Sequence, residues 1–439
     1  MVAAAPTCSL SPASPLPRRQ RRRPPGLSRF AGLAGLVCVS FARFAAAMGP
    51  EIRYASPPSG AAGWPRACSV HHPICIHSAP GTTTTLATLA SADRAWEVLT
   101  ETLEAPAPDT DADGAWHIYL ADQAAGVEGS STALPTWRDP VARFDRASSF
   151  ALVDGRTATG CGLDLAVARA VARASLWRSA PATDEGSARA QAEALARLAV
   201  PCAAGGDDLA EFQADPERTL VDPTVASYDR GAGLFFDWVD ATFGAEPGGV
   251  ITGLWALSPT RTPGAAWRWA EAPTGFDVLR ASLQGALGTD STLDDVLVRF
   301  AVDRGTAAPP VRVAWHIPWP AAARRFASPV PVSPTGASYV LVDLAGAPPA
   351  AKLRVEAAWE DFGRMRWAIV KLDARGRALA VVPVTSLRLG TQASMTVELL
   401  DGVDRILVVG VNVGSTEHPF DPGQGEWEPH GWLLTLEGG

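Results

Sequence analysis

The hydrophobic pattern of the chain changes its period once, near residues 306–310, and this change limits the possible folds most strongly. Between residues 81 and 305, apolar side chains recur about every four residues, which is typical of helices. After Pro309-Pro310 they alternate with polar residues in short segments, which is typical of strands. We therefore predict an α+β protein, with a mainly helical domain and a small N-terminal sheet over 81–305, followed by an all-β sandwich over 310–439.

The first predicted helix of the helical part is Ser91–Glu104, with Ser91 as the expected N-cap. A strand is expected after it, over Trp116–Leu120. A loop is expected over 203–224, because Gly-Gly and Asp-Pro pairs interrupt it. Six further helices follow from the apolar spacing, at Gly162–Trp177, Asp184–Leu198, Tyr228–Phe243, Gly249–Leu257, Gly275–Gly288 and Thr292–Val302.

The last 130 residues contain short alternating segments separated by Gly, Asp and Pro turns, such as Asp401-Gly402. This spacing is typical of a β-sandwich. The eight expected strands are Val311–Ile317, Ser338–Leu344, Lys352–Trp359, Arg366–Leu372, Ala378–Val384, Ser394–Leu399, Arg405–Val413 and Gly431–Leu436.

Residues 1–47 have the layout of a signal or export segment. Seven arginines and no acidic residue lie there, and the basic cluster Arg18–Arg23 precedes an apolar stretch that ends in small residues near Ala47. A disordered arginine-rich tail is the alternative. Residues 48–80 are expected to form an irregular lead-in with one short strand over Ile74–His77. We predict an exported protein, periplasmic or extracellular, with no membrane span after maturation.

Charge argues against one class of partner. Without its seven N-terminal arginines, the formal net charge of −8 falls to −15. An acidic protein lacks the lysines and arginines that sequence-independent nucleic-acid binding needs, so no nucleic-acid partner is predicted.

Four cysteines follow the export segment, and export favours disulfides. Four cysteines allow three pairings, among which local spacing favours Cys68–Cys75 and Cys161–Cys202. Three histidines lie within or beside the first pair, so a zinc cluster is the alternative there. In an oxidising compartment the disulfide is the favoured interpretation.

Three segments between residues 70 and 305 resemble a gluzincin-type zinc metallopeptidase domain, as found in bacterial secreted proteins. They are Ile74–His77 with the helix that contains Trp96, the Pro108–Gly114 turn with the strand that follows it, and Gly231–Gly244. A trailing β-sandwich is also common after such domains. The resemblance implies a zinc site on the helix over Gly162–Trp177, held by a His-Glu-x-x-His motif.

The chain departs from that family at this motif, which is absent from the sequence. The best register places Arg169, Ala170 and Arg173 at the positions of the two histidines and the glutamate, and Glu185 near the position of the third ligand. Arginine has no lone pair for a metal, and alanine cannot act as a base. We predict a degenerate site without zinc, in which Glu185 or Asp184 pairs with one of the arginines. The alternative is that both arginines point to solvent.

Three further features of the sequence each have two interpretations. Asp109, Asp111 and Asp113 match the first half of a calcium loop, but Leu120 stands where the bidentate glutamate belongs, so weak calcium binding competes with a solvated turn. Asp237 and Asp240 are expected on a solvated helix face, with a catalytic acid pair as the alternative. The tryptophans belong either to the core or to a binding groove, and those of interest are Trp255, Trp267, Trp269, Trp315 and Trp319.

No nucleophile elbow, phosphate loop or dinucleotide fingerprint is present. The leading hypothesis is a non-catalytic, peptidase-like protein that binds a peptide, a polymer such as a polysaccharide, or a partner protein, with no cofactor unless calcium binds. A hydrolase with an unrecognised non-zinc site is one alternative. An adhesion or structural module that acts through the sandwich is the other.

Overall fold

The computed structural model describes residues 53–121, 131–138, 145–200, 206–222, 224, 226–257, 269, 274–284, 291–348, 350–384, 390–399, 402–416, 420, 423 and 425–439. The predicted export segment, Cys202 and Trp267 lie outside these residues.

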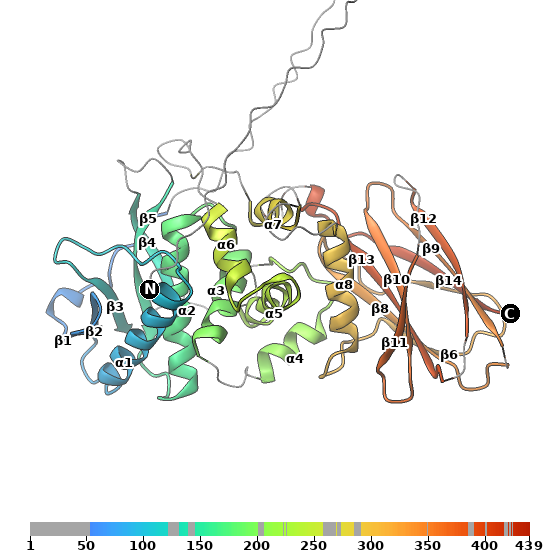
Figure 1. Cartoon of the computed structure of the whole chain (residues 1–439), viewed down its shortest axis with the longest axis horizontal. Helices are drawn as coiled ribbons and strands as arrows, with labels where there is room; N and C mark the ends of the chain where they lie inside the picture. The colour runs from blue at the N-terminus through green and yellow to red at the C-terminus, as the bar shows by residue number, and fades with distance from the viewer. Residues whose placement is uncertain are drawn as a thin grey trace, which may run out of the picture. The chain divides into compact units, whose positions relative to one another are not determined.

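A five-stranded sheet forms the N-terminal end of the described chain, in the order β1-β2-β3-β5-β4. Strands β2, β3 and β5 run parallel, whereas β1 and β4 are antiparallel edge strands. Ile74, Ile76 and Ile118 on β2 and β3 point into the main core, where helices α1 and α2 cover the sheet (Figure 1). The strand bounds are Arg66–Cys68, Ile74–Ser78, Trp116–Ala121, Ser131–Arg138 and Ala147–Asp154 for β1 to β5.

Eight helices make up the middle of the described chain. Helix α2 packs against the sheet on one side and against α3 on the other, and α3 packs against α5. Their bounds are Thr85–Trp96, Cys161–Ser179, Glu185–Ala199, Gly206–Ala214, Ala226–Phe243, Gly249–Leu257, Gly275–Gln284 and Leu293–Thr306 for α1 to α8. A π-helical turn, Glu97–Thr102, extends α1.

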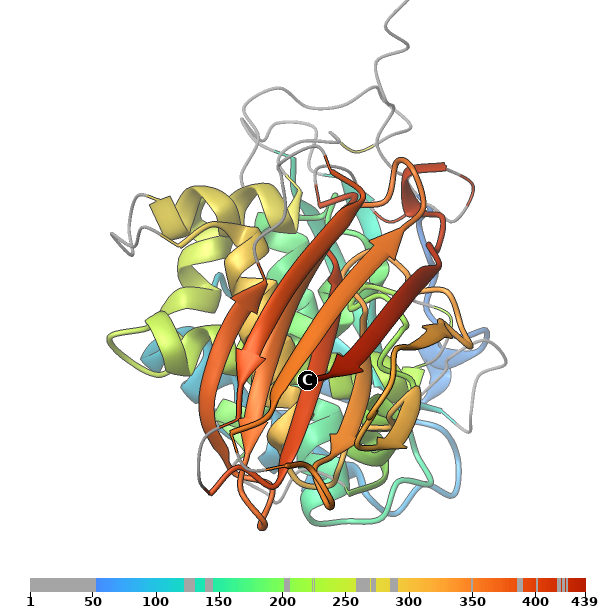
Figure 2. The ribbon, with the colours of Figure 1, turned by 90° about the vertical axis from the view of Figure 1, so that its right-hand side faces the viewer.

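The C-terminal part is a sandwich of two antiparallel-rich sheets, with strand orders β11-β10-β13-β8-β6 and β12-β9-β14-β7. Figure 2 shows its strands from the side of the C-terminus. The bounds are Trp315–Pro318, Arg324–Ala327, Ala337–Asp343, Lys352–Trp359, Met365–Leu372, Ala378–Val384, Gln392–Glu398, Arg405–Asn412 and Trp432–Gly438 for β6 to β14. The core between the sheets is apolar, with Leu353, Ile369 and Leu434 fully buried.

Helix α8 joins the two parts, because it packs against β10 and β13 (Figure 1). Tyr339 of β8 is fully buried, and its hydroxyl donates a 2.8 Å hydrogen bond to the carbonyl of Ala301. Gly305 has no side chain that could collide with the Tyr339 ring, since a Cβ there would lie 2.7 Å from it. One core cluster therefore contains side chains from both parts.

The predicted α+β class and the C-terminal sandwich are confirmed. The change of period coincides with the segment between Thr306, where α8 ends, and Trp315, where β6 begins. Most predicted elements are present with ends shifted by a few residues. The predicted helix over 275–288 is seen to Gln284, and the described part ends there. Among the described residues, no helix has the length and apolar content needed to cross a membrane.

Three local predictions are wrong. Helix α1 starts at Thr85, so Ser91 is not an N-cap; its hydroxyl donates to the carbonyl of Ala87 within the helix. Helix α4 occupies part of the expected loop over 203–224, because Phe212 is buried against Tyr228. The predicted strand over 311–317 begins only at Trp315, and the prediction also missed β1, β4, β5 and β7.

The Tyr339 contact yields a stability prediction. Tyr339→Ala should lower the free energy of unfolding by about 3–5 kcal/mol, because a fully buried aromatic ring is lost. Tyr339→Phe should cost about 1 kcal/mol, the value of one hydrogen bond. Urea denaturation measures both, and Leu379→Ala at an exposed position of β11 is the control, with an expected change below about 0.5 kcal/mol. Equal effects of Tyr339→Ala and Leu379→Ala would contradict the role of this contact.

Candidate functional site

Helix α2 carries the positions that the metallopeptidase resemblance assigns to zinc. The helix is buried along most of its length, and Ala170 is fully buried. Small alanine side chains let α2 pack closely against its neighbours. Arg169 and Arg173 lie one turn apart on this helix, and both point towards α3 rather than to solvent, as their ion pairs with that helix show.

Arg173 pairs with Glu185, which is one of the pairings that the sequence analysis left open. Its Nη2 lies 2.7 Å from Glu185 Oε2, and the side chain is 5% exposed. The guanidinium lies 4.5 Å from the ring centre of Trp177, which adds a cation–π contact. Its Nη1 is buried and has no hydrogen-bond partner. Glu185 also accepts from Arg189 Nε at 3.0 Å, one turn further along α3.

Arg169 pairs with Glu193, a residue that the sequence reasoning missed. Glu193 is buried, and it also lies 3.3 Å from Arg197 Nε. Arg197 continues the chain of charges to α5, where its Nη1 lies 2.8 Å from Asp237 Oδ2. Glu193 could have been found by its spacing, because it lies two helical turns after Glu185 and so shares its face. The network links α2, α3 and α5.

The pKa values of the acidic side chains follow from burial and from these partners. Burial raises the pKa of Glu185, but Arg173 and Arg189 outweigh it and hold the pKa below its usual value. Asp184 is the N-cap of α3 and accepts from the Ser187 amide at 2.8 Å, yet burial raises its pKa to about 6. Burial likewise raises the pKa of Asp237 to about 6, against the pull of Arg197.

This arrangement offers no ligand set for zinc. Guanidinium groups occupy the two positions that imidazoles would need, and each of them is bound to a carboxylate of α3. A cation placed between these helices would meet two fixed positive charges. Ala170, at the position of the general base, has no group that could activate water.

The predicted disulfide Cys68–Cys75 is confirmed, with a Cα–Cα distance of 4.1 Å. Cys161 is also disulfide-bonded, and its predicted partner Cys202 lies outside the described residues. The zinc alternative for the first pair therefore loses its two thiolates.

The three carboxylates of the predicted calcium loop are engaged by protein side chains, and two of them, Asp111 and Asp113, share His117. Asp109 accepts from the Ser148 hydroxyl at 2.6 Å, whereas Asp113 pairs with Arg66 at 2.8 Å. Asp111 lies 3.5 Å from His117 Nε2. Among the described residues, no group of three or more His, Cys, Asp or Glu side chains is arranged to hold a metal ion.

The expectation of a solvated face for Asp237 and Asp240 is wrong. Asp240 is buried and accepts from the amides of Gly248 and Val250 at 2.6 and 2.9 Å, so it caps the first turn of α6. The sequence did not reveal this role, because a turn separates Asp240 from the helix that it caps.

The tryptophans that the sequence analysis named fall into two groups. Trp255 and Trp269 are buried, whereas Trp315 is 39% exposed. Trp319 is partly buried against the sandwich core.

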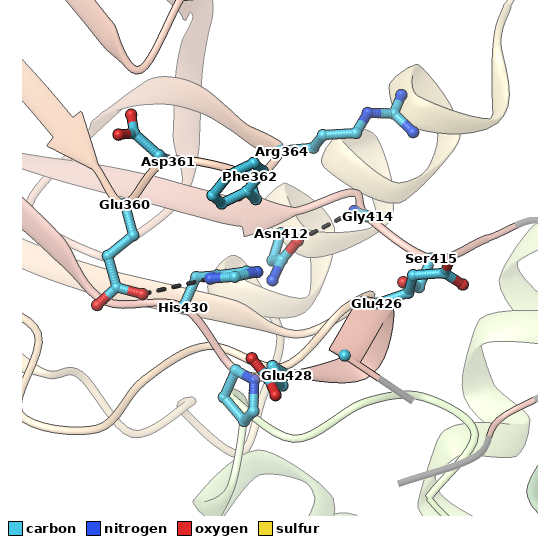
Figure 3. Close-up of a pocket in the computed structure, with 12 residues that line it drawn as sticks. Glu360, Asp361, Phe362, Arg364, Asn412, Gly414, Ser415, Glu426, Glu428 and His430 are labelled. Atoms are coloured by element: carbon cyan, nitrogen blue, oxygen red, sulfur yellow. Dashed lines mark hydrogen bonds and ion pairs between the residues drawn. The ribbon is translucent and has the colours of Figure 1, made fainter. Parts of the chain in front are cut away.

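A polar pocket of about 670 Å³ lies in the C-terminal sandwich (Figure 3). Three segments build it: the turn between β9 and β10, the end of β13, and residues 425–430. Its lining is rich in carboxylates, and Phe362 on its rim is 98% exposed at φ 74°, a left-handed conformation that is rare for a bulky side chain. The acidic side chains are Glu360, Asp361, Glu426 and Glu428.

The pocket has a negative balance of charge. His430 Nδ1 lies 3.3 Å from Glu360 Oε2. Figure 3 marks this pair with a dashed line. Arg364 is the single arginine of the lining, and its guanidinium lies 3.0 Å from Asp294 of α8, outside the pocket. Buried Asn412 supports the floor, where its amide donates to the Val332 carbonyl and its oxygen accepts from the Gly414 amide.

No family model matches the chain, and no curated protein matches it. Among solved structures, the pre-peptidase C-terminal domain of a Bacillus anthracis collagenase is 7% identical, with 29% of this chain and 97% of that chain covered and a TM-score of 0.19. The enzymatically active domain of bacteriophage CBA120 tailspike protein 4 is 13% identical over 26% of this chain and 15% of that chain, at a TM-score of 0.18. The GH115 4-O-methyl-α-glucuronidase BtGH115A is 10% identical over 63% of this chain and 30% of that chain, at 0.15. Likenesses at these scores carry no argument about function.

The ion-pair network predicts a large effect at its centre. Glu193→Gln should lower the free energy of unfolding by about 3–5 kcal/mol, because it leaves Arg169 and Arg197 without their buried carboxylate. Glu356→Gln removes the carboxylate of an exposed pair with Arg354 on β9 and should cost less than about 1 kcal/mol. Chemical denaturation of both variants measures the contrast. A Glu193→Gln protein as stable as Glu356→Gln would show that the buried pairs do not hold the helices.

Asp184 predicts a pH dependence. The pKa of Asp184 rises from 3.8 in the unfolded chain to about 6 in the folded protein. Between about pH 4 and pH 6, Asp184 is therefore ionised in the unfolded chain but still protonated in the folded protein. The free energy of unfolding should fall as the pH rises through this range. Asp184→Asn keeps an N-cap acceptor and removes the charge. Relative to wild type, the variant should gain roughly 1–2 kcal/mol between pH 4 and pH 7, measured by denaturation at each pH. A constant difference between the two proteins over that range would contradict the raised pKa.

Proposed function

We propose that this chain is an exported, non-catalytic, metallopeptidase-like protein that acts by binding. The proposal rests on the two ion pairs that join α2 to α3. Arg169 and Arg173 stand at the zinc-motif positions, and both are neutralised by carboxylates of the next helix. Because both guanidinium groups bind carboxylates of α3, Arg169 and Arg173 contribute to the packing of α2 against α3 rather than to a metal site.

The pocket of Figure 3 supports binding as the activity. It combines four carboxylates with one fully exposed aromatic ring. Carboxylates attract cationic groups, and an aromatic face adds a cation–π contact. A lysine- or arginine-rich segment of a peptide or protein fits this chemistry best. The second candidate function is binding of a polysaccharide by the sandwich, for which the exposed Phe362 ring is a stacking surface.

Hydrolysis tests the non-catalytic part. The full-length protein, incubated with an unfolded protein substrate and added Zn²⁺, should show no cleavage above a heat-denatured sample, because Arg169, Ala170 and Arg173 can neither hold zinc nor activate water. Mass spectrometry of the substrate is the measurement. Cleavage that a chelator abolishes would overturn the proposal, and its loss in an Arg173→Ala variant would locate it at α2.

Ligand binding tests the pocket. A fluorescent oligolysine peptide should bind the wild type, and Phe362→Ala should weaken binding about three- to fivefold, the value of an exposed cation–π contact. Glu428→Gln should weaken it as well, and the loss should diminish at high salt. Leu379→Ala, at an exposed apolar position of β11, is the matched control and should bind as wild type does. Binding of a neutral oligosaccharide in place of oligolysine would favour the second candidate instead.

A further inference from the structure

Two histidines face each other on the N-terminal sheet, away from both sites above. The parallel register of β2 and β3 pairs Cys75 with His117 and His77 with Tyr119. Since side chains alternate along a strand, these residues lie on the face opposite the buried Ile76 and its neighbours. His77 Nε2 lies 3.0 Å from His117 Nδ1.

The second ring nitrogen of His117 fixes the proton on that ring. His117 Nε2 lies 3.2 Å from Asp113 Oδ1 and 3.5 Å from Asp111 Oδ2. Ionised carboxylates only accept hydrogen bonds, so His117 carries its proton on Nε2. Its Nδ1 therefore directs a lone pair at His77. His117 is 7% exposed, which keeps this orientation.

We propose that His77 Nε2 and His117 Nδ1 bind a divalent transition-metal ion, Zn²⁺ or Cu²⁺, with water in the remaining positions. Two nitrogens that bind tetrahedral zinc at 2.0–2.1 Å lie about 3.3 Å apart, so the observed pair needs to open by only a few tenths of an ångström. Imidazole is a favoured ligand of both ions. Asp113 would accept a hydrogen bond from His117 Nε2, as carboxylates commonly do from the second ring nitrogen of a metal-bound histidine.

The surrounding charges permit a cation. Asp111 and Asp113 contribute two negative charges, and Arg66 contributes one positive charge, bound to Asp113 at 2.8 Å. The Tyr119 ring stacks on His77 at 4.7 Å and limits its rotation. Metal binding then requires only that His77 move its proton from Nε2 to Nδ1.

The site has two protein ligands, consistent with the lack of any larger ligand group among the described residues. Because both protein ligands are imidazole nitrogens, the site should bind Cu²⁺ more tightly than Zn²⁺, as expected from the Irving–Williams order. Mg²⁺ and Ca²⁺, which take oxygen ligands, should not compete. This inference is independent of the proposed function, because the site shares no residue with α2, α3 or the sandwich pocket.

Titration of the full-length, metal-free protein with Cu²⁺ and Zn²⁺ tests the site. The wild type should bind one more equivalent than His77→Ala, and electron paramagnetic resonance of that Cu²⁺ should report two imidazole nitrogens. Asp113→Asn should weaken this equivalent about 10- to 100-fold. His430→Ala, which changes the histidine of the sandwich pocket, is the matched control and should retain it.

His77 is only partly buried, so His77→Ala should keep the fold, which circular dichroism checks. Equal metal binding by wild type and His77→Ala would overturn the proposal, and so would the absence of any binding by the wild type. In either case the two rings share a proton and no metal.

Discussion

The packing of the helices depends on how two guanidinium groups are accommodated on a buried helix. A charge removed from water is costly unless a partner of opposite sign accompanies it. Helix α3 supplies two partners, eight residues apart. Arg173 meets Glu185 and Arg169 meets Glu193, so the order of the pairs is that of antiparallel helices. Sliding α3 by one turn would break both pairs at once.

The same constraint extends to α5. Arg197 binds Glu193 and Asp237, and its Nη2 also donates to the Arg230 carbonyl at 2.7 Å. The third helix can approach because Gly233 has no side chain, since a Cβ there would lie 3.1 Å from Glu193 Cγ. Buried ion pairs contribute little net stability compared with apolar packing, but they select one arrangement among several. In this protein such pairs join α2 to α3 and α3 to α5.

The sequence predicted what depends on local patterns. The change of hydrophobic period indicated the α+β class and the sandwich, and the close spacing of Cys68 and Cys75 indicated their disulfide. It also predicted that Glu185 or Asp184 would pair with one of the two arginines of α2, because all four lie on or beside helices that the pattern identifies, but it did not say which pair would form. Predictions failed where tertiary contacts outweigh local preference. Phe212 stabilises α4 within a segment rich in helix-breaking pairs, and the β-branched threonines before Leu86 concealed the start of α1.

Side-chain contacts across a turn or between distant segments were not predicted for Asp240, for the two histidines of the sheet or for the sandwich pocket. Asp240 serves α6 across a turn, and His77 meets His117 forty residues later through the parallel pairing of β2 and β3. The same holds for the pocket, whose carboxylates come from segments more than sixty residues apart. A one-dimensional pattern records which residues alternate or recur, but not which strand becomes the neighbour.

The three polar groups of side chains differ in how their charge is balanced, and this difference separates structural from binding roles. In the α2–α3 network each buried arginine has a carboxylate, so a ligand would gain little by entering. In the sandwich pocket four carboxylates face one arginine, which Asp294 also attracts. Around His117 two carboxylates face one arginine. Among these three groups, carboxylates outnumber arginines at the two places where we propose that cationic ligands bind, whereas each of the two arginines of α2 meets a carboxylate of α3.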